Sequence, residues 1–134
     1  MKAIQIMRQP VFAATRTAAA QDIAAQLVVN SISGMPVAEP DGTVVGVVSE
    51  ADILRALVEG KRLETLTAQE IMNAHPITVD VETPLAEVMK TVHEYGILRV
   101  PVTDQGHLVG IISRGDIIRA AVESFQTQPF IIFS

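Results

Sequence analysis

Two stretches of the chain place a serine and an aspartate at the same short spacing directly after an apolar run. They are residues 46–53 (GVVSEADI) and 110–117 (GIISRGDI). Ser-x-x-Asp before a helical run is close to a capping box, in which the side chains satisfy the free backbone donors of a starting helix. The same groups could instead bind a nucleotide, because a helix N-terminus attracts phosphate and a carboxylate accepts two ribose hydroxyls. The two roles are compatible, and the motif alone does not decide between them.

The two motifs belong to an internal duplication of the chain. Ile6-Met7 recurs as Ile71-Met72 and Met35-Pro36-Val37 recurs as Val100-Pro101-Val102, both at a shift of 65 residues. Residues 42–59 align with residues 106–123 at a shift of 64, with ten of 18 positions identical. Such self-similarity predicts two copies of one supersecondary unit that pack on each other.

Each copy is expected to fold as β-α-β-β-α. Apolar stripes of helical period start near residues 19 and 85, and Thr83 and Pro84 predict a capped helix start in the second copy. Asp-Gly at 41–42 and Gln-Gly at 105–106 predict hairpin turns. The expected strands are 11–14, 36–39 and 44–48, with 77–79, 100–103 and 108–112 in the second copy, and the expected final helices are 50–59 and 114–124.

Composition excludes several functional classes. The 134 residues carry a net charge of −5, and scattered basic residues do not suit a phosphate backbone, so we expect no nucleic-acid partner. The chain has no Cys, and its three His share no ligand spacing, so we expect no metal site. No stretch approaches about 18 apolar residues, so we expect a cytoplasmic protein without a membrane partner. No catalytic triad, paired catalytic carboxylate or P-loop is visible, so we expect no enzyme.

The order Ile-Met, strand, helix, apolar-Pro-Val, turn, Gly-apolar-apolar-Ser-x-x-Asp-Ile resembles the CBS domain family in both copies. The resemblance covers residues 6 to about 124 and implies a tandem CBS pair, or Bateman module. The implied fold class is α/β (α+β), with two intertwined β-α-β-β-α repeats related by pseudo-two-fold symmetry. The expected boundaries are 1–60 for the first repeat, 61–70 for a polar linker, 71–124 for the second repeat and 125–134 for a C-terminal tail.

The resemblance also implies two clefts that bind adenosine-type ligands. In this family the Asp typically holds the ribose, the Ser lies near the phosphates, and the residues before Pro-Val flank the adenine. Each cleft joins one Ser-x-x-Asp motif to the early strand and pre-Pro segment of the other repeat. One cleft is therefore expected to use Val47, Ser49, Asp52, Thr78, Ile97, Leu98 and Arg99. The other is expected to use Ile111, Ser113, Arg114, Asp116, Ala13, Ile32, Ser33 and Gly34.

Two functions follow from this resemblance. The first is a non-catalytic regulatory sensor that binds AMP, ADP, ATP or S-adenosylmethionine, needs no other cofactor, and acts as a homodimer on an effector protein. The second is a constitutive dimerisation scaffold with vestigial clefts. Because Glu50 stands where the other copy has Arg114, we expect the Asp116 cleft to accept the more highly charged nucleotide.

Overall fold

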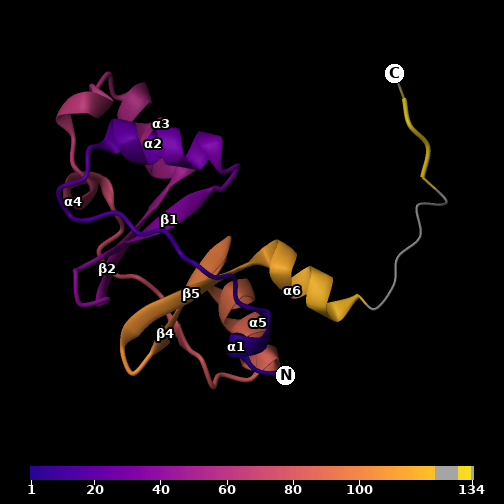
Figure 1. Cartoon of the computed structure of the whole chain (residues 1–134). Coiled ribbons are helices and arrows are strands. Elements are labelled where there is room, and N and C mark those ends of the chain that lie inside the picture. The colour runs from indigo at the N-terminus through magenta and orange to yellow at the C-terminus, as the bar shows by residue number, and fades with distance from the viewer. Residues whose placement is uncertain (123–129, 134) are drawn as a thin grey trace.

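A computed structural model describes residues 1–122 and 130–133 of the chain, and Figure 1 shows the arrangement of its elements. The first half holds α1 (Ala3–Ile6), α2 (Ala20–Val29), β1 (Gly34–Ala38), β2 (Val44–Ser49) and α3 (Glu50–Val58). The short 3-10 helix η1 (Leu63–Thr65) follows. The second half holds α4 (Ala68–Ile71), β3 (Val79–Asp80), α5 (Leu85–Tyr95), β4 (Arg99–Asp104), β5 (His107–Ser113) and α6 (Arg114–Ala121).

The two halves repeat the same β-hairpin and flanking helices. β1 pairs antiparallel with β2, and β4 pairs antiparallel with β5. A third strand, β3, runs parallel to β4. In the first half the expected strand at 11–14 is reduced to one bridge between Ala14 and Val37. Each half thus has a small sheet whose apolar residues must be buried against other elements of the chain.

The repeats are intertwined through their first helices. In Figure 1, α1 lies with the second half, where it contacts β5 and α6, whereas α4 lies with α2 and α3 of the first half. Ala3 of α1 and Ala68 of α4 are each 0% exposed and belong to opposite cores. Their backbone amides donate equivalent hydrogen bonds, from Ala3 to the Thr83 carbonyl and from Ala68 to the Ala18 carbonyl, both 2.8 Å. The fold class expected from the sequence is confirmed.

Two aliphatic clusters form the core, one in each half. The cluster of the first half contains Ala14, Ala20, Ile23, Leu27, Met35, Val37, Val48, Ile53 and Ala68. The cluster of the second half contains Ala3, Val79, Val81, Val88, Val92, Val100, Val102, Ile112 and Ile117. Buried positions in α2 and α5 recur at helical spacing, which is the stripe that the sequence predicts.

The repeated glycines and methionines pack against one another. A Cβ added at Gly46 would lie 2.5 Å from the Met72 sulfur, and one at Gly110 would lie 2.6 Å from the Met7 sulfur. A side chain at either glycine would therefore collide with the methionine of the repeated Ile-Met pair.

Three local features differ from expectation. Residues 61–70, expected as a polar linker, include η1 and most of α4, because Ala68 is needed to complete the core of the first half. Thr83 does not cap α5; its hydroxyl accepts from the Asp80 amide (3.1 Å) and Pro84 is the N-cap. The helix expected at 114–124 ends at Ala121, and residues 123–124 lie outside the described part of the chain.

The C-terminal tail is described only in part. Phe130, Ile131, Ile132 and Phe133 are all exposed, and the rest of the expected tail, 125–129 and 134, lies outside the described residues. Among residues 1–122 and 130–133, no helix has the length and hydropathy needed to cross a membrane.

Candidate functional site

Both Ser-x-x-Asp motifs form capping boxes at helix starts. Ser49 is the N-cap of α3; its amide donates to Asp52 Oδ2 (2.8 Å), and the Asp52 amide donates to Ser49 Oγ (3.4 Å). Ser113 and Asp116 make the same pair of bonds at α6, at 2.9 and 3.2 Å. The structural role expected for the motif is confirmed in both copies, and it fixes each carboxylate at the first turn of its helix.

A cavity of about 320 Å³ lies beside Asp52, between the two repeats. We call it the Asp52 cavity. Its volume falls in the range of small-molecule sites, roughly 300–1,000 Å³. It is lined by Ser33, Gly34, Val47, Ser49, Ala51, Asp52, Arg55, Asn73, Pro76, Ile77, Gly96, Ile97, Leu98 and Arg99.

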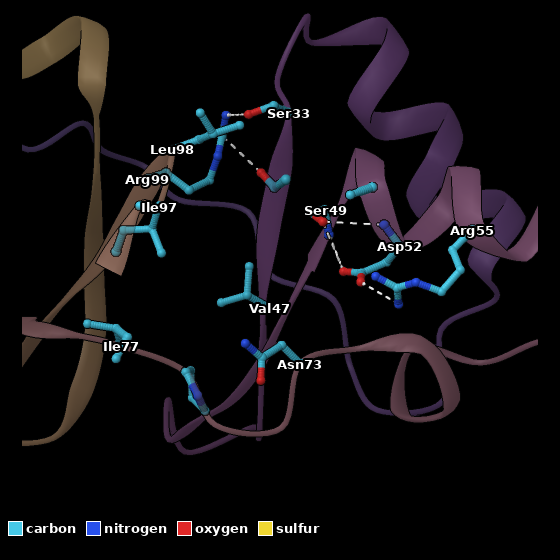
Figure 2. Close-up of a pocket in the computed structure, with 14 residues that line it drawn as sticks. Ser33, Val47, Ser49, Asp52, Arg55, Asn73, Ile77, Ile97, Leu98 and Arg99 are labelled. Atoms are coloured by element: carbon cyan, nitrogen blue, oxygen red, sulfur yellow. Dashed lines mark hydrogen bonds and ion pairs between the residues drawn. The ribbon is translucent and has the colours of Figure 1, made fainter. Parts of the chain in front are cut away.

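The Asp52 cavity has a polar end and apolar walls. Figure 2 shows Ser49 and Asp52 at the start of α3, with Arg55 further along the same helix, facing Ile97, Leu98 and Arg99 of the second repeat. Further apolar atoms come from β2 and from the segment that leads to β3. The cavity therefore offers apolar walls for a flat ring and a polar end with a carboxylate and a helix N-terminus.

Six of the seven residues expected in this cleft line the cavity together. They are Val47, Ser49, Asp52, Ile97, Leu98 and Arg99. The seventh, Thr78, is exposed, and its neighbour Ile77 lines the cavity in its place.

Arg99 connects the two repeats at the edge of this cavity. Its guanidinium donates to the Gly34 carbonyl (2.9 Å) and to the Ser33 hydroxyl, as Figure 2 shows. Burial lowers the pKa of Arg99, while the charges of Glu50 and Asp116 act in the opposite direction. Ser33 and Gly34 were expected in the other cleft, but the geometry brings them to the Asp52 cavity together with Arg99.

Asp116 has different surroundings from Asp52. It is only 5% exposed, and its Oδ1 accepts hydrogen bonds from Arg8 Nε (2.7 Å) and from Arg119 (3.1 Å). Burial raises the pKa of the Asp116 carboxyl, but the hydrogen bonds from Ser113 and Arg8 outweigh it and leave the pKa below its ordinary value. The side chain is thus held as a carboxylate by groups of the same chain.

The remaining residues expected around Asp116 lie in several different surroundings. Ala13 is exposed, Ile32 packs against the core of the first half, and Ile111 pairs through its backbone with Arg8. The Arg114 side chain donates from Nε to the Ile97 carbonyl (2.9 Å). It lines a second cavity, of about 390 Å³, with Met89, Val92, His93, Ile117 and Ile118 of α5 and α6.

Several lining residues were not singled out from the sequence. Arg55 is one of them: it lines the cavity and donates to Asp52 Oδ1 (3.3 Å). Asn73 follows the repeated Ile-Met pair and could have been found by comparing it with Arg8, its counterpart at a shift of 65. Within the described residues, no group of three His, Asp or Glu side chains is placed to hold a metal ion.

A profile of the CBS domain matches residues 3–59 and again residues 68–123. Together the matches span most of the chain, and each includes one of the two capping-box helices. The chain belongs to the CBS domain family. Its intertwined pair of repeats is accordingly a tandem CBS pair.

Two curated relatives illustrate the similarity of this CBS pair in sequence. The protein MK0525 of Methanopyrus kandleri is 25% identical over 130 residues, covering 96% of this chain and 63% of that protein. The L-aspartate semialdehyde sulfurtransferase of Methanocaldococcus jannaschii is 30% identical over 115 residues, covering 85% of this chain but 22% of that enzyme. The chain thus spans less than two thirds of the length of either relative.

Solved CBS pairs are similar in structure and have been crystallised with adenosine compounds. The CBS pair of protein MJ0100, in complex with 5′-methylthioadenosine and S-adenosylmethionine, has a TM-score of 0.81 at 29% identity, covering 90% of this chain and 95% of that one. The protein PAE2072 of Pyrobaculum aerophilum, complexed with AMP, has a TM-score of 0.80 at 29% identity, covering 87% and 89%.

Proposed function

We propose that this CBS pair is a non-catalytic, cytoplasmic regulatory module that binds an adenosine-type nucleotide in the Asp52 cavity. The observation that carries the proposal is the cavity itself, in which a carboxylate at a capped helix start faces apolar side chains of the other repeat. The ligands named for MJ0100 and PAE2072 support an adenosine compound such as AMP or S-adenosylmethionine. No other cofactor is required.

In this proposal each part of the ligand has a partner in the cavity. The adenine lies against Ile77, Ile97 and Leu98, and the two ribose hydroxyls donate to Asp52. A phosphate or other 5′ group lies toward Ser49 and the N-terminus of α3, where backbone N–H groups favour an anion. The expected preference of the Asp116 cleft for the more highly charged nucleotide rests on Glu50, which stands where the other copy has Arg114, and it stays a prediction.

Thermal unfolding in the presence of AMP, ADP, ATP, 5′-methylthioadenosine and S-adenosylmethionine tests the proposal. A ligand at 100 times its Kd adds about 2.7 kcal/mol to the free energy of unfolding, which is a shift of roughly 8 °C or more for a chain of this size. GMP is the matched control because it changes only the base. If no adenosine compound raises the midpoint, the alternative of a scaffold with vestigial clefts is correct.

We further propose that the module is a homodimer that signals to an effector protein. Apolar side chains are exposed on the helices of both repeats, among them Leu54, Leu57, Val58, Met89 and Ile118. Such a surface is more than a monomer normally leaves open to water. Light scattering should give twice the chain mass of 14.4 kDa at micromolar concentration, and a mass of one chain would refute the dimer.

A further inference from the structure

The residue that follows each Ile-Met pair differs between the repeats. Arg8 and Asn73 are equivalent at a shift of 65, and their backbones make the same bridge to the second strand of a hairpin. The Arg8 amide donates to the Ile111 carbonyl (2.8 Å), and the Asn73 amide donates to the Val47 carbonyl (2.9 Å). The two side chains therefore start from matching points beside the two capping-box carboxylates.

The two side chains end in different places. Asn73 lines the Asp52 cavity, and Asp52 Oδ1 has only the long bond from Arg55 at 3.3 Å. Arg8 instead reaches across the corresponding space and donates to Asp116 Oδ1 at 2.7 Å. The oxygen that would accept a ribose hydroxyl therefore holds only the long bond from Arg55 at Asp52, whereas at Asp116 it holds a short bond from Arg8 in addition to the bond from Arg119, the counterpart of Arg55.

We infer that Arg8 determines which cleft accepts a nucleotide: it occupies Asp116 in place of the ribose, so that each chain binds one ligand, in the Asp52 cavity. The inference rests on the proposed function. A neutral hydroxyl that displaced Arg8 would exchange a charge-assisted hydrogen bond for a weaker one, which disfavours a second ligand. Asn73 is uncharged and leaves the Asp52 carboxylate available.

Calorimetric titration with AMP, reported as ligand bound per chain, tests this inference. The wild-type chain should bind one AMP, and Arg8→Asn, which copies the residue at the equivalent position, should bind two. The double variant Arg8→Asn/Asp116→Asn should again bind one AMP per chain. The reciprocal variant Asn73→Arg should weaken binding to the Asp52 cavity roughly tenfold or more.

Arg62→Asn is the matched control, because it removes an exposed arginine paired with Glu64 outside both clefts and should leave one AMP per chain. Arg8→Ala replaces Arg8→Asn if the latter does not fold. Two AMP bound by the wild type, or one by the folded Arg8 variants, would overturn the inference but not the proposed function. If only the Arg8→Asn variant binds AMP, the inference about Arg8 is supported, but the proposal that the Asp52 cavity binds the nucleotide is refuted. Absence of AMP binding from every variant refutes both.

Discussion

Replacing each capping-box aspartate by asparagine separates ligand binding from helix capping. Asparagine keeps the shape of the side chain and one acceptor oxygen, so the bond from the Ser49 amide (2.8 Å) can be retained in Asp52→Asn. Loss of a cap costs about 0.5–2 kcal/mol, and we expect this variant near the lower end. The ribose hydroxyls would lose their charged acceptor. Since a charged hydrogen bond exceeds a neutral one by about 1 kcal/mol, two such bonds weaken nucleotide binding by roughly 10- to 100-fold.

Asp116→Asn should give the opposite result. Its carboxylate accepts from both Arg8 and Arg119 and is buried, but the two guanidinium groups are mostly exposed and remain solvated after the change. We expect a loss of about 1–3 kcal/mol in the free energy of unfolding, larger than for Asp52→Asn, with nucleotide affinity unchanged within about twofold. Urea unfolding measures the first quantity and calorimetry the second. Normal binding by Asp52→Asn together with lost binding by Asp116→Asn would refute the assignment of the site.

Three further outcomes are expected. Gly46→Ala places a Cβ 2.5 Å from the Met72 sulfur and 2.9 Å from a backbone oxygen, so its melting should show a loss of about 1–3 kcal/mol and its nucleotide affinity should fall. The lowered pKa of Asp116 contributes stability at neutral pH that is lost as the pH falls through that pKa. Urea unfolding should therefore show that the difference in free energy of unfolding between wild type and Arg8→Ala narrows as the pH falls below about 4. Gly96→Asn should cost less than about 1 kcal/mol in the same assay, because Asn tolerates φ = 62° at this helix end, whereas Gly96→Val should cost more.

The duplication in the sequence predicts most of the fold. Once residues 42–59 are aligned with 106–123, each hairpin and each final helix follows from turn chemistry and apolar period. The capping boxes were also predicted correctly, because a capping box is decided within four residues. The prediction that Thr83 caps α5 was wrong, because the Thr83 hydroxyl accepts a hydrogen bond from the Asp80 amide. A hydroxyl with two nearby donors cannot be assigned from sequence alone.

The site was less predictable because it depends on contacts between the repeats. The family resemblance places Ser33 and Gly34 in one cleft and Arg99 in the other. In the structure Arg99 donates to both residues, and all three line the Asp52 cavity. Arg8 was not identified because its partner lies 108 residues away. Aligning the two repeats places Arg8 opposite Asn73, but only the packing shows that Arg8 contacts the Asp116 carboxylate.

The exchange of first helices sets an order for synthesis of the chain. α1 is made well before the side chains that share its core cluster, among them Val102 and Ile112. At about 5–20 residues per second, these side chains appear roughly 5–20 s later. A four-residue helix is not stable alone over that time. The first half can pack against α4 soon after its own hairpin is made. The second half can complete its core only when α1 meets β4, β5 and α6, which are made much later.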